Sequence, residues 1–430
     1  MALGFTLILL LFLLFIGTPV AFSLGISGIV GMMLTSGFDG VYSLLYTVPY
    51  RTAANYTMSV IPMFVLMAQF ISVSGLVKDV FTAARRWLER MPGGMAIAAI
   101  LSSAGVAAMS GSSTASAATT ASIAIPEMIN NGYSTQVAAG VVTVAGTLAI
   151  MIPPSVGLVL YAIITENSIG QMLIAGIIPG IMTALVYIVG VVIWQKVSPG
   201  AMPRTTRLYS WSQRMQSLRP LWAFIILALS VVGSIYMGWA TPTEAASVGA
   251  LGSLVLPLLQ KRIGFRDIIT ALIRTLEITT MIFTIIIGAM IFGYFLTITR
   301  APSQIISVIG SMNAPAWMIL GLLLIVIIIL GLFLDQIAIA LITLPLIYPV
   351  IMDLGYNPIW FGIVAVKVSE IGLITPPVGM NAYVVSASTG IPLDQVFRGV
   401  SIMLLFELIT LVILLSFPAL CTWLPLMMQQ

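Results

Sequence analysis

Histidine is absent from this 430-residue sequence, and cysteine occurs once, at Cys421. Without histidine there is no imidazole for a zinc site, a haem iron or a Ser-His catalytic pair. A single cysteine excludes an internal disulfide and every metal site that needs several thiolates. The phosphate-binding pattern GxxxxGK[ST] is also missing, so ATP is not hydrolysed on this chain. We therefore expect neither an enzyme nor a resident cofactor.

Charged residues are scarce as well, at 7% of the chain, where about 25% is usual in a soluble domain. Hydrophobic residues make up 60%, and the mean hydropathy is +1.14. Apolar runs long enough to span a bilayer, about 20 residues each, recur from Leu3 to Leu424. The sequence predicts one all-α, multi-pass membrane domain over residues 1–430. Its first apolar run lacks the flanks of a removable signal and is expected to stay.

Most of the basic residues lie in three loops, which the positive-inside rule places on the cytoplasmic side. The net charge of +4 therefore describes topology and predicts no nucleic-acid partner. Two spans, about 221–240 and 244–259, separate the last two loops. Between them, Thr241, Pro242 and Glu244 form a helix-capping pattern, which gives Glu244 a structural role. The loops contain Lys78, Arg85, Arg86 and Arg90; Lys196, Arg204, Arg207, Arg214 and Arg219; and Lys261, Arg262, Arg266 and Arg274.

An internal repeat emerges when Pro92 is aligned with Pro315 without a gap. All four prolines of 92–176 then fall on prolines of 315–399, namely Pro92, Pro126, Pro153 and Pro154 on Pro315, Pro349, Pro376 and Pro377. On the predicted topology the two copies enter the membrane from opposite faces, as in secondary transporters built from inverted repeats. We assign scaffold helices to 1–75, scaffold and connecting helices to 177–300, and a terminal helix to 400–430.

The stretch "MSGSSTASAATTAS", which starts at Met109, consists of small and hydroxyl-bearing residues after its methionine. It lies in an uncharged segment from Gly93 to Pro126, about 51 Å long as a straight helix, against about 30 Å of hydrocarbon. The segment is too long for one crossing and too short for two. We predict a re-entrant hairpin that turns at "SGSST" and lines a wet cavity. The alternative is a close helix seam of small residues, which we favour for Ser116, Thr119, Thr120 and Ser122.

In the second copy, Asp335 and Gln336 lie at the equivalent depth of an apolar segment. A carboxylate at that depth is a functional hypothesis, because burying its charge in hydrocarbon is costly. Asp335 can balance a bound Na⁺, cap the next half-helix, or do both.

Each repeat also contains a Pro-Pro pair that cannot continue a helix, and a plain kink is the alternative to a full break. We expect Thr375 to cap a new half-helix that starts at Pro376, with Ser155 capping nearby in the first copy. Four half-helix N-termini then point at one region. Helix N-termini attract anions and unwound carbonyls attract cations, which predicts an anionic substrate moving with Na⁺ or H⁺.

Together, "GSSTASAAT", "IPPS", "TPTEAA" and "EIGLITPPVGMN" resemble the large membrane subunit of tripartite ATP-independent periplasmic (TRAP) transporters, over essentially the whole chain. This resemblance implies Na⁺-coupled import of an organic acid across a bacterial inner membrane by an elevator-type fold. It also implies two partners, a small membrane subunit and a periplasmic binding protein, and the chain is too short to include the small subunit by fusion.

Carried over to matching positions, the resemblance implies two sodium sites. Lys367 and Glu370 lie three residues apart, are expected to pair with each other, and belong to neither site. The first has Ser110, Gly111, Ser112 and Ser113 with carbonyls from Pro153 to Ser155. The second has Asp335 with Thr375, Pro377 and Gly379. Ser112, Thr114, Arg300 and Asn381 are candidate substrate ligands.

Arg300 has a guanidinium suited to a carboxylate, and it resembles an arginine of the family's sialic-acid branch. Its alternative role is an anchor at the membrane interface. Three other functions stay open: a stand-alone carrier that needs no binding protein, a passive channel and, least favoured, an intramembrane protease.

Overall fold

The computed structural model describes residues 2–203, 209–311 and 314–428, and it excludes the side chains of 108–110 and 308–311. Every regular element in these ranges is a helix. Eight helices are long and apolar enough to cross a membrane, and nine spans result if the bent pair Thr135–Met151 and Val156–Ile164 counts as one. The predicted all-α, multi-pass membrane fold is confirmed.

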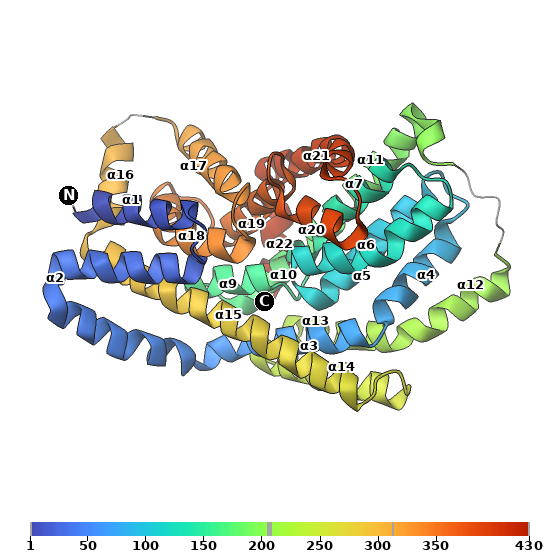
Figure 1. The fold of residues 1–430 in the computed structure, drawn as a ribbon, viewed down its shortest axis with the longest axis horizontal. Coiled ribbons are helices and arrows are strands. Elements are labelled where there is room, and N and C mark those ends of the chain that lie inside the picture. Colours follow the sequence, from blue (N-terminus) through green and yellow to red (C-terminus); the bar gives the residue numbers. More distant parts are fainter. Residues whose placement is uncertain (1, 204–208, 312–313, 429–430) are drawn as a thin grey trace.

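One layer of the molecule is built around the long helix α15 (Phe265–Ile298), which packs along α2 and α3 (Figure 1). In α2 a kink at Gly37 separates two limbs. We call the following set the α15 layer: α2 (Val20–Ala53), α3 (Val60–Val73), α13 (Trp222–Tyr236), α14 (Pro242–Leu259) and α15. The helices α13 and α14 match the predicted pair of spans. The Thr241–Glu244 capping box starts α14 as predicted.

The first repeat forms a helical hairpin followed by a broken helix. Its elements are α5 (Gly94–Ser110), α6 (Ser113–Asn130), α7 (Thr135–Ala145), α8 (Leu148–Met151) and α9 (Val156–Ile164). The hairpin turns at Gly111 and Ser112, within the predicted "SGSST" turn. The helix breaks at Ile152–Pro154 and restarts after Ser155, whose side chain accepts a hydrogen bond from the backbone N–H of Leu158.

The second repeat has the same order of elements: α17 (Ala316–Gly331), α18 (Gln336–Asp353), α19 (Pro358–Ile374) and α20 (Met380–Thr389). When the two repeats are aligned with Pro92 on Pro315, the first and last residues of α6 fall on the first and last residues of α18. Ser134 and Asn357 fall on each other, and each caps the following helix through its side chain. The two hairpins and the two breaks are therefore confirmed. The two hairpins enter from opposite sides of the molecule in Figure 1, with α5 and α6 at the right and α17 and α18 at the left.

One prediction about the second break is wrong. Thr375 ends α19 instead of capping the next half-helix, and its hydroxyl donates back to the carbonyl of Ile371 at 2.5 Å. A cap at Thr375 would accept from the N–H of the second or third residue after it, and Pro377 at the second position has none. The chain stays unwound until Gly379, in a left-handed conformation with φ of 57°, and α20 starts at Met380.

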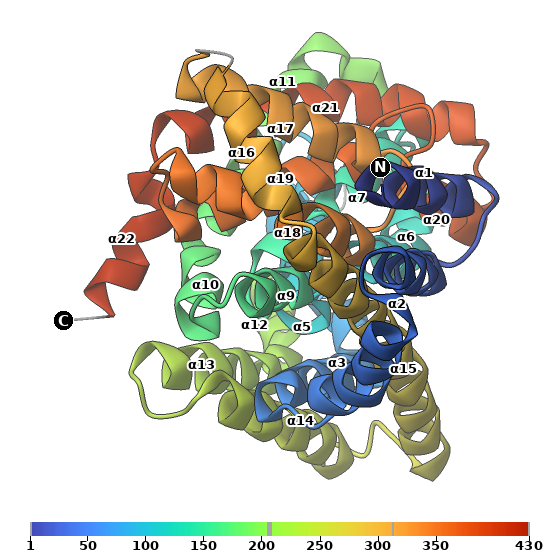
Figure 2. The ribbon, with the colours of Figure 1, turned by 90° about the vertical axis from the view of Figure 1, so that its left-hand side faces the viewer.

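The repeats pack together through close backbone contacts to form what we call the hairpin layer, α5–α9 and α17–α20 with the helices that follow each repeat. The latter are α10 (Ile169–Ala175), α11 (Ile177–Val197) and α21 (Leu393–Ser416). Gly140 of α7 meets Gly399 of α21 backbone to backbone, as small residues allow in membrane proteins. Figure 2 shows this layer above α3, α13 and α14.

Shorter elements complete the chain at its ends and between the layers. They are α1 (Ala2–Phe15), η1 (Tyr56–Ser59), α4 (Leu76–Leu88), η2 (Pro199–Ala201), α12 (Trp211–Leu218), η3 (Arg219–Leu221), α16 (Ala301–Ser311) and α22 (Ala419–Met427). The helix α4 has one polar face, and its Arg85 forms an ion pair with Glu127 of α6 at 2.6 Å.

Candidate functional site

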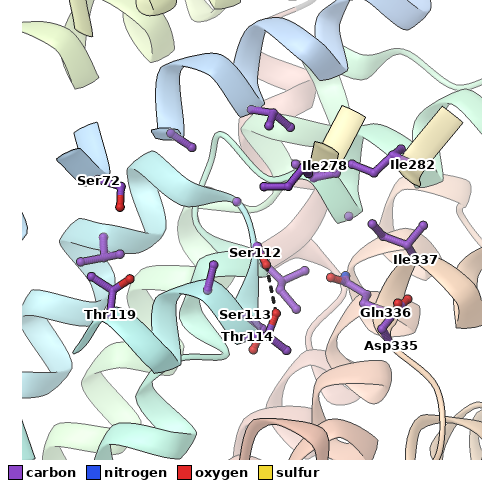
Figure 3. A pocket seen from close by; sticks show the side chains of 18 of the residues that line it. Ser72, Ser112, Ser113, Thr114, Thr119, Ile278, Ile282, Asp335, Gln336 and Ile337 are labelled. Carbon is purple, nitrogen blue, oxygen red and sulfur yellow. Dashed lines mark hydrogen bonds between the residues drawn. The ribbon is translucent and has the colours of Figure 1, made fainter. Parts of the chain in front are cut away.

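The two layers enclose a cavity of about 450 Å³, and both hairpin tips open into it (Figure 3). From the first tip come Gly111, Ser112, Ser113 and Thr114, and from the second come Asp335 and Gln336. Segments beside the two breaks add Ile150, Val156, Gly157, Leu373 and Val384. The opposite wall belongs to α3 and α15, with Val65, Ala68, Gln69, Ile71, Ser72, Ile278, Met281 and Ile282.

The first tip touches the break of its own repeat. A Cβ atom added at Gly111 would lie 3.0 Å from the carbonyl oxygen of Pro154, and Gly111 has φ of 60°. Among the described residues, no hydrogen bond reaches the carbonyls of Pro153 or Pro154. Free carbonyls next to hydroxyls are hard oxygen ligands of the kind alkali cations accept. Ser155 contributes less, because its hydroxyl and its carbonyl both serve α9.

Each tip also contacts the other repeat. Asn381 of α20 donates a hydrogen bond to the hydroxyl of Ser113 at 2.5 Å, and both side chains are buried. The equivalent residue of the second tip, Gln336, lies against the backbone of Gly157 at the start of α9. These contacts join the first tip to the half-helix after the second break and the second tip to the half-helix after the first break.

The two tips present different helix N-termini to the cavity. The first backbone N–H groups of a helix have no partner within it. At α6 these belong to Ser113, Thr114 and Ala115, and the capping residue Ser112 makes no side-chain bond to them. The Ser112 hydroxyl lies instead 3.3 Å from that of Thr114. The N-terminus of α6 is thus open to an anion.

At α18 the N-terminus is already occupied by a carboxylate. An oxygen of Asp335 accepts a hydrogen bond from the backbone N–H of Ala338 at 2.8 Å, so the predicted cap is present. Among the described residues, Asp335 is the only charged side chain lining the cavity. The same carboxylate therefore caps a helix and adds negative charge to this wall.

The structure does not gather all of the predicted ligands. Thr375, Pro377 and Gly379 do not line the cavity, and Pro376 and Pro377 are exposed. Arg300 is exposed just after α15, with φ of 50°, and does not line the cavity either. The side chain of Ser110 lies outside the described residues. The roles of these residues as ligands stay predictions.

Several cavity residues escaped the sequence analysis. Gln69 and Ser72 of α3 lie three residues apart in an apolar helix, a polar pair whose spacing is a usable signal. Thr119, assigned to a helix seam, lines the cavity, whereas Ser116 and Thr120 are buried as the seam predicted. The isoleucines of α15 carry no signal in the sequence, since only packing brings them here.

The fold is that of a multi-pass membrane protein whose two repeats meet at one cavity, the arrangement of a membrane permease. Residues 7–420 match the family model described as "Tripartite ATP-independent periplasmic transporter, DctM component". The chain belongs to this family, the large permease subunits of TRAP transporters, which are multi-pass proteins of the inner membrane.

Two relatives and one solved structure show how far the similarity extends. The C4-dicarboxylate TRAP transporter large permease protein DctM of Pseudomonas aeruginosa is 39% identical over 94% of this chain and 93% of its own. The sialic acid TRAP transporter large permease protein SiaM of Vibrio cholerae is 28% identical over 96% of both chains. The Alcanivorax borkumensis YdaH transporter superposes with a TM-score of 0.63 at 14% identity, over 89% of each chain, and this supports the fold alone.

Proposed function

We propose that this permease moves a small organic acid together with Na⁺ through the cavity between its two layers. The observation that carries the proposal is the convergence of two hairpin tips and the segments beside two broken helices on one cavity. Such a site combines the open N-terminus of α6 for an anion with unwound carbonyls for a cation. The two charges can then cross the hydrocarbon as a neutralised set, which lowers the cost of burying either alone.

The Na⁺ ions belong at the two hairpin tips. At the first tip, the free carbonyls of Pro153 and Pro154 supply neutral oxygens, with Gly111 packed against Pro154, and the hydroxyls of Ser112 and Ser113 follow Gly111 in the chain. At the second tip, Asp335 supplies a full negative charge. Carbonyls of the open break between Thr375 and Gly379 complete the second site as we propose it.

The substrate carboxylate belongs at the N-terminus of α6. There the unpaired backbone N–H groups and the hydroxyls of Ser112 and Thr114 face the cavity, while Asn381 positions Ser113. Among the described residues no lysine or arginine lines this cavity, so the anion depends on backbone dipoles and on the bound Na⁺.

We propose a C4-dicarboxylate as the substrate. The support is the 39% identity to a relative named for C4-dicarboxylates, against 28% to one named for sialic acid. Arg300, the residue that pointed toward the sialic-acid branch, does not line the cavity, which is a second argument for this choice.

The layered fold supports an elevator mechanism, in which the hairpin layer slides along the α15 layer and carries the site with it. The family's name as a tripartite periplasmic transporter supports two partners, a periplasmic binding protein that delivers substrate and a small membrane subunit that completes the fixed part.

The test is uptake of labelled succinate into proteoliposomes that contain the permease and its small subunit. We expect uptake of succinate only when the binding protein is present and an inward Na⁺ gradient is applied. Uptake of labelled sialic acid should be low. Robust uptake without the binding protein would establish a stand-alone carrier instead. Uptake unchanged when K⁺ replaces Na⁺ would overturn the coupling.

A further inference from the structure

A cluster of charged side chains lies in the interior of the hairpin layer, outside the cavity. Lys367 and Glu370 on α19 and Glu407 on α21 are all 0% exposed. The Lys367 ammonium lies 3.0 Å from an oxygen of Glu370 and 2.7 Å from one of Glu407. The Tyr187 hydroxyl on α11 donates to the other oxygen of Glu407 and lies 3.0 Å from the hydroxyl of Thr147.

The charges of this cluster do not balance. Two carboxylates face a single ammonium, and the phenol of Tyr187 adds no positive charge. The other helices packed against α19, namely α8, α9, α10, α17, α18, α20 and α22, bring no Asp, Glu, Lys or Arg to the cluster in the described part of the chain. An uncompensated charge buried this completely is as destabilising as a severe core mutation, even after relaxation. A further positive charge is therefore needed.

The hydrogen bonds indicate which atom receives it. Oε1 of Glu407 makes no hydrogen bond among the described residues but lies 2.7 Å from the Lys367 ammonium as an ion pair, and Oε2 accepts a hydrogen bond from Tyr187, so both oxygens face a donor. Glu370 meets Lys367 with Oε2 only, and among the described residues its Oε1 has no hydrogen-bond partner. One free oxygen cannot coordinate a metal cation, which needs several, but it is sufficient for a proton.

The position of the cluster relates it to the cavity. Glu370 and Thr147 each lie six residues before the first proline of their break, so they are equivalent in the two repeats. Three residues further along their helices, Leu373 and Ile150 line the cavity. The cluster thus joins the two repeats about one helical turn away from the cavity wall.

We propose that Lys367, Glu370 and Glu407 form a proton-binding site, in which one proton taken from water is held on Oε1 of Glu370. Protonation converts that carboxylate to a carboxylic acid and makes the cluster neutral, and no other bond changes. The neutral cluster holds the two repeats together. Loss of the proton leaves a buried negative charge between them. This site is separate from the proposed Na⁺ sites and does not depend on Na⁺ coupling.

The first test is infrared spectroscopy of the purified full-length permease at pH 7, comparing wild type with Glu370→Gln. We expect the difference spectrum to contain the carbonyl stretch of a protonated carboxylic acid that exchanges slowly in D₂O. The control is Glu277→Gln, an exposed glutamate paired with Arg274, whose difference spectrum should contain ionised carboxylate bands only. Carboxylate bands alone in the Glu370→Gln difference would overturn the proposal.

The second test measures thermal unfolding as a function of pH. Since Gln resembles a protonated Glu, Glu370→Gln should fold and have the same midpoint temperature as the wild type at pH 6. Toward pH 9 the midpoint temperature of the variant should stay constant, whereas that of the wild type should fall. Glu407→Gln leaves one oxygen acceptor for Lys367 and Tyr187 together, so this variant should unfold several degrees lower at every pH. Parallel curves for wild type and Glu370→Gln, or a Glu370→Gln protein that does not fold, would refute the proton site.

Discussion

At the residue scale, Asp335 combines a helix cap with the only described charge on the cavity wall. Asp335→Asn keeps an acceptor for the Ala338 N–H and removes the charge. Because hydrogen bonds and contacts to a charged group contribute about 1.5–3 kcal/mol, we expect the Na⁺ concentration for half-maximal uptake to rise about tenfold or more. The matched control is Asp353→Asn, exposed at the other end of α18. Equal Na⁺ dependence in both variants would remove Asp335 from the site.

A second residue-scale prediction concerns Gly111, where the left-handed backbone and the nearby Pro154 carbonyl both disfavour a side chain. Gly111→Ala should lower stability by about 1–2 kcal/mol from backbone conformation and also displace the tip, with loss of uptake. Gly390→Ala is the control, since Gly390 has φ of 73° and no atom within 4 Å of an added Cβ. The temperature of thermal unfolding should fall in both variants, whereas transport should fail only in Gly111→Ala. Normal transport by Gly111→Ala would contradict the tip contact.

At the scale of elements, the contact between the first hairpin and α20 depends on the bond from Asn381 to Ser113. A double-mutant cycle of Asn381→Ala and Ser113→Ala, measured by thermal unfolding, should give a coupling of about 1 kcal/mol, the usual net value of a buried hydrogen bond. Each single variant should also reduce substrate affinity, because the tip is no longer positioned. Ser134→Ala, which removes a helix cap away from the cavity, is expected to lower stability alone. Additive effects in the cycle would show that the two elements are not coupled here.

At the scale of the whole molecule, an elevator requires the hairpin layer to move against the α15 layer. Ser72 of α3 and Thr119 of α6 line the same cavity from opposite layers. With Cys421 replaced by Ser, a short bifunctional reagent across Ser72→Cys and Thr119→Cys should stop uptake. The control pair, Leu227→Cys and Gly252→Cys, lies within the α15 layer and should leave uptake intact after cross-linking. Continued transport with the layers linked would contradict the sliding motion.

Much of this architecture was predictable because its signals are local. The unbroken alignment of prolines gave both repeats, the length of the uncharged segment gave the first hairpin, and the capping pattern at Thr241 gave the start of α14. The position of the second break was predicted correctly, but the capping role of Thr375 was not. Thr375 turned back to its own helix, and Pro377 lacks the N–H that a capping hydroxyl at Thr375 would use at the second residue.

The sequence by itself determined the class of the protein, since an apolar chain with paired Pro-Pro breaks has few ways to satisfy its backbone within a bilayer. Only the tertiary structure decided which residues meet. Pairing Lys367 with Glu407, or facing Asp335 with isoleucines of α15, depends on how helices distant in sequence pack. Packing in lipid is set by shape and close backbone contact rather than by hydrophobicity, so the composition of each helix carries little record of its neighbours.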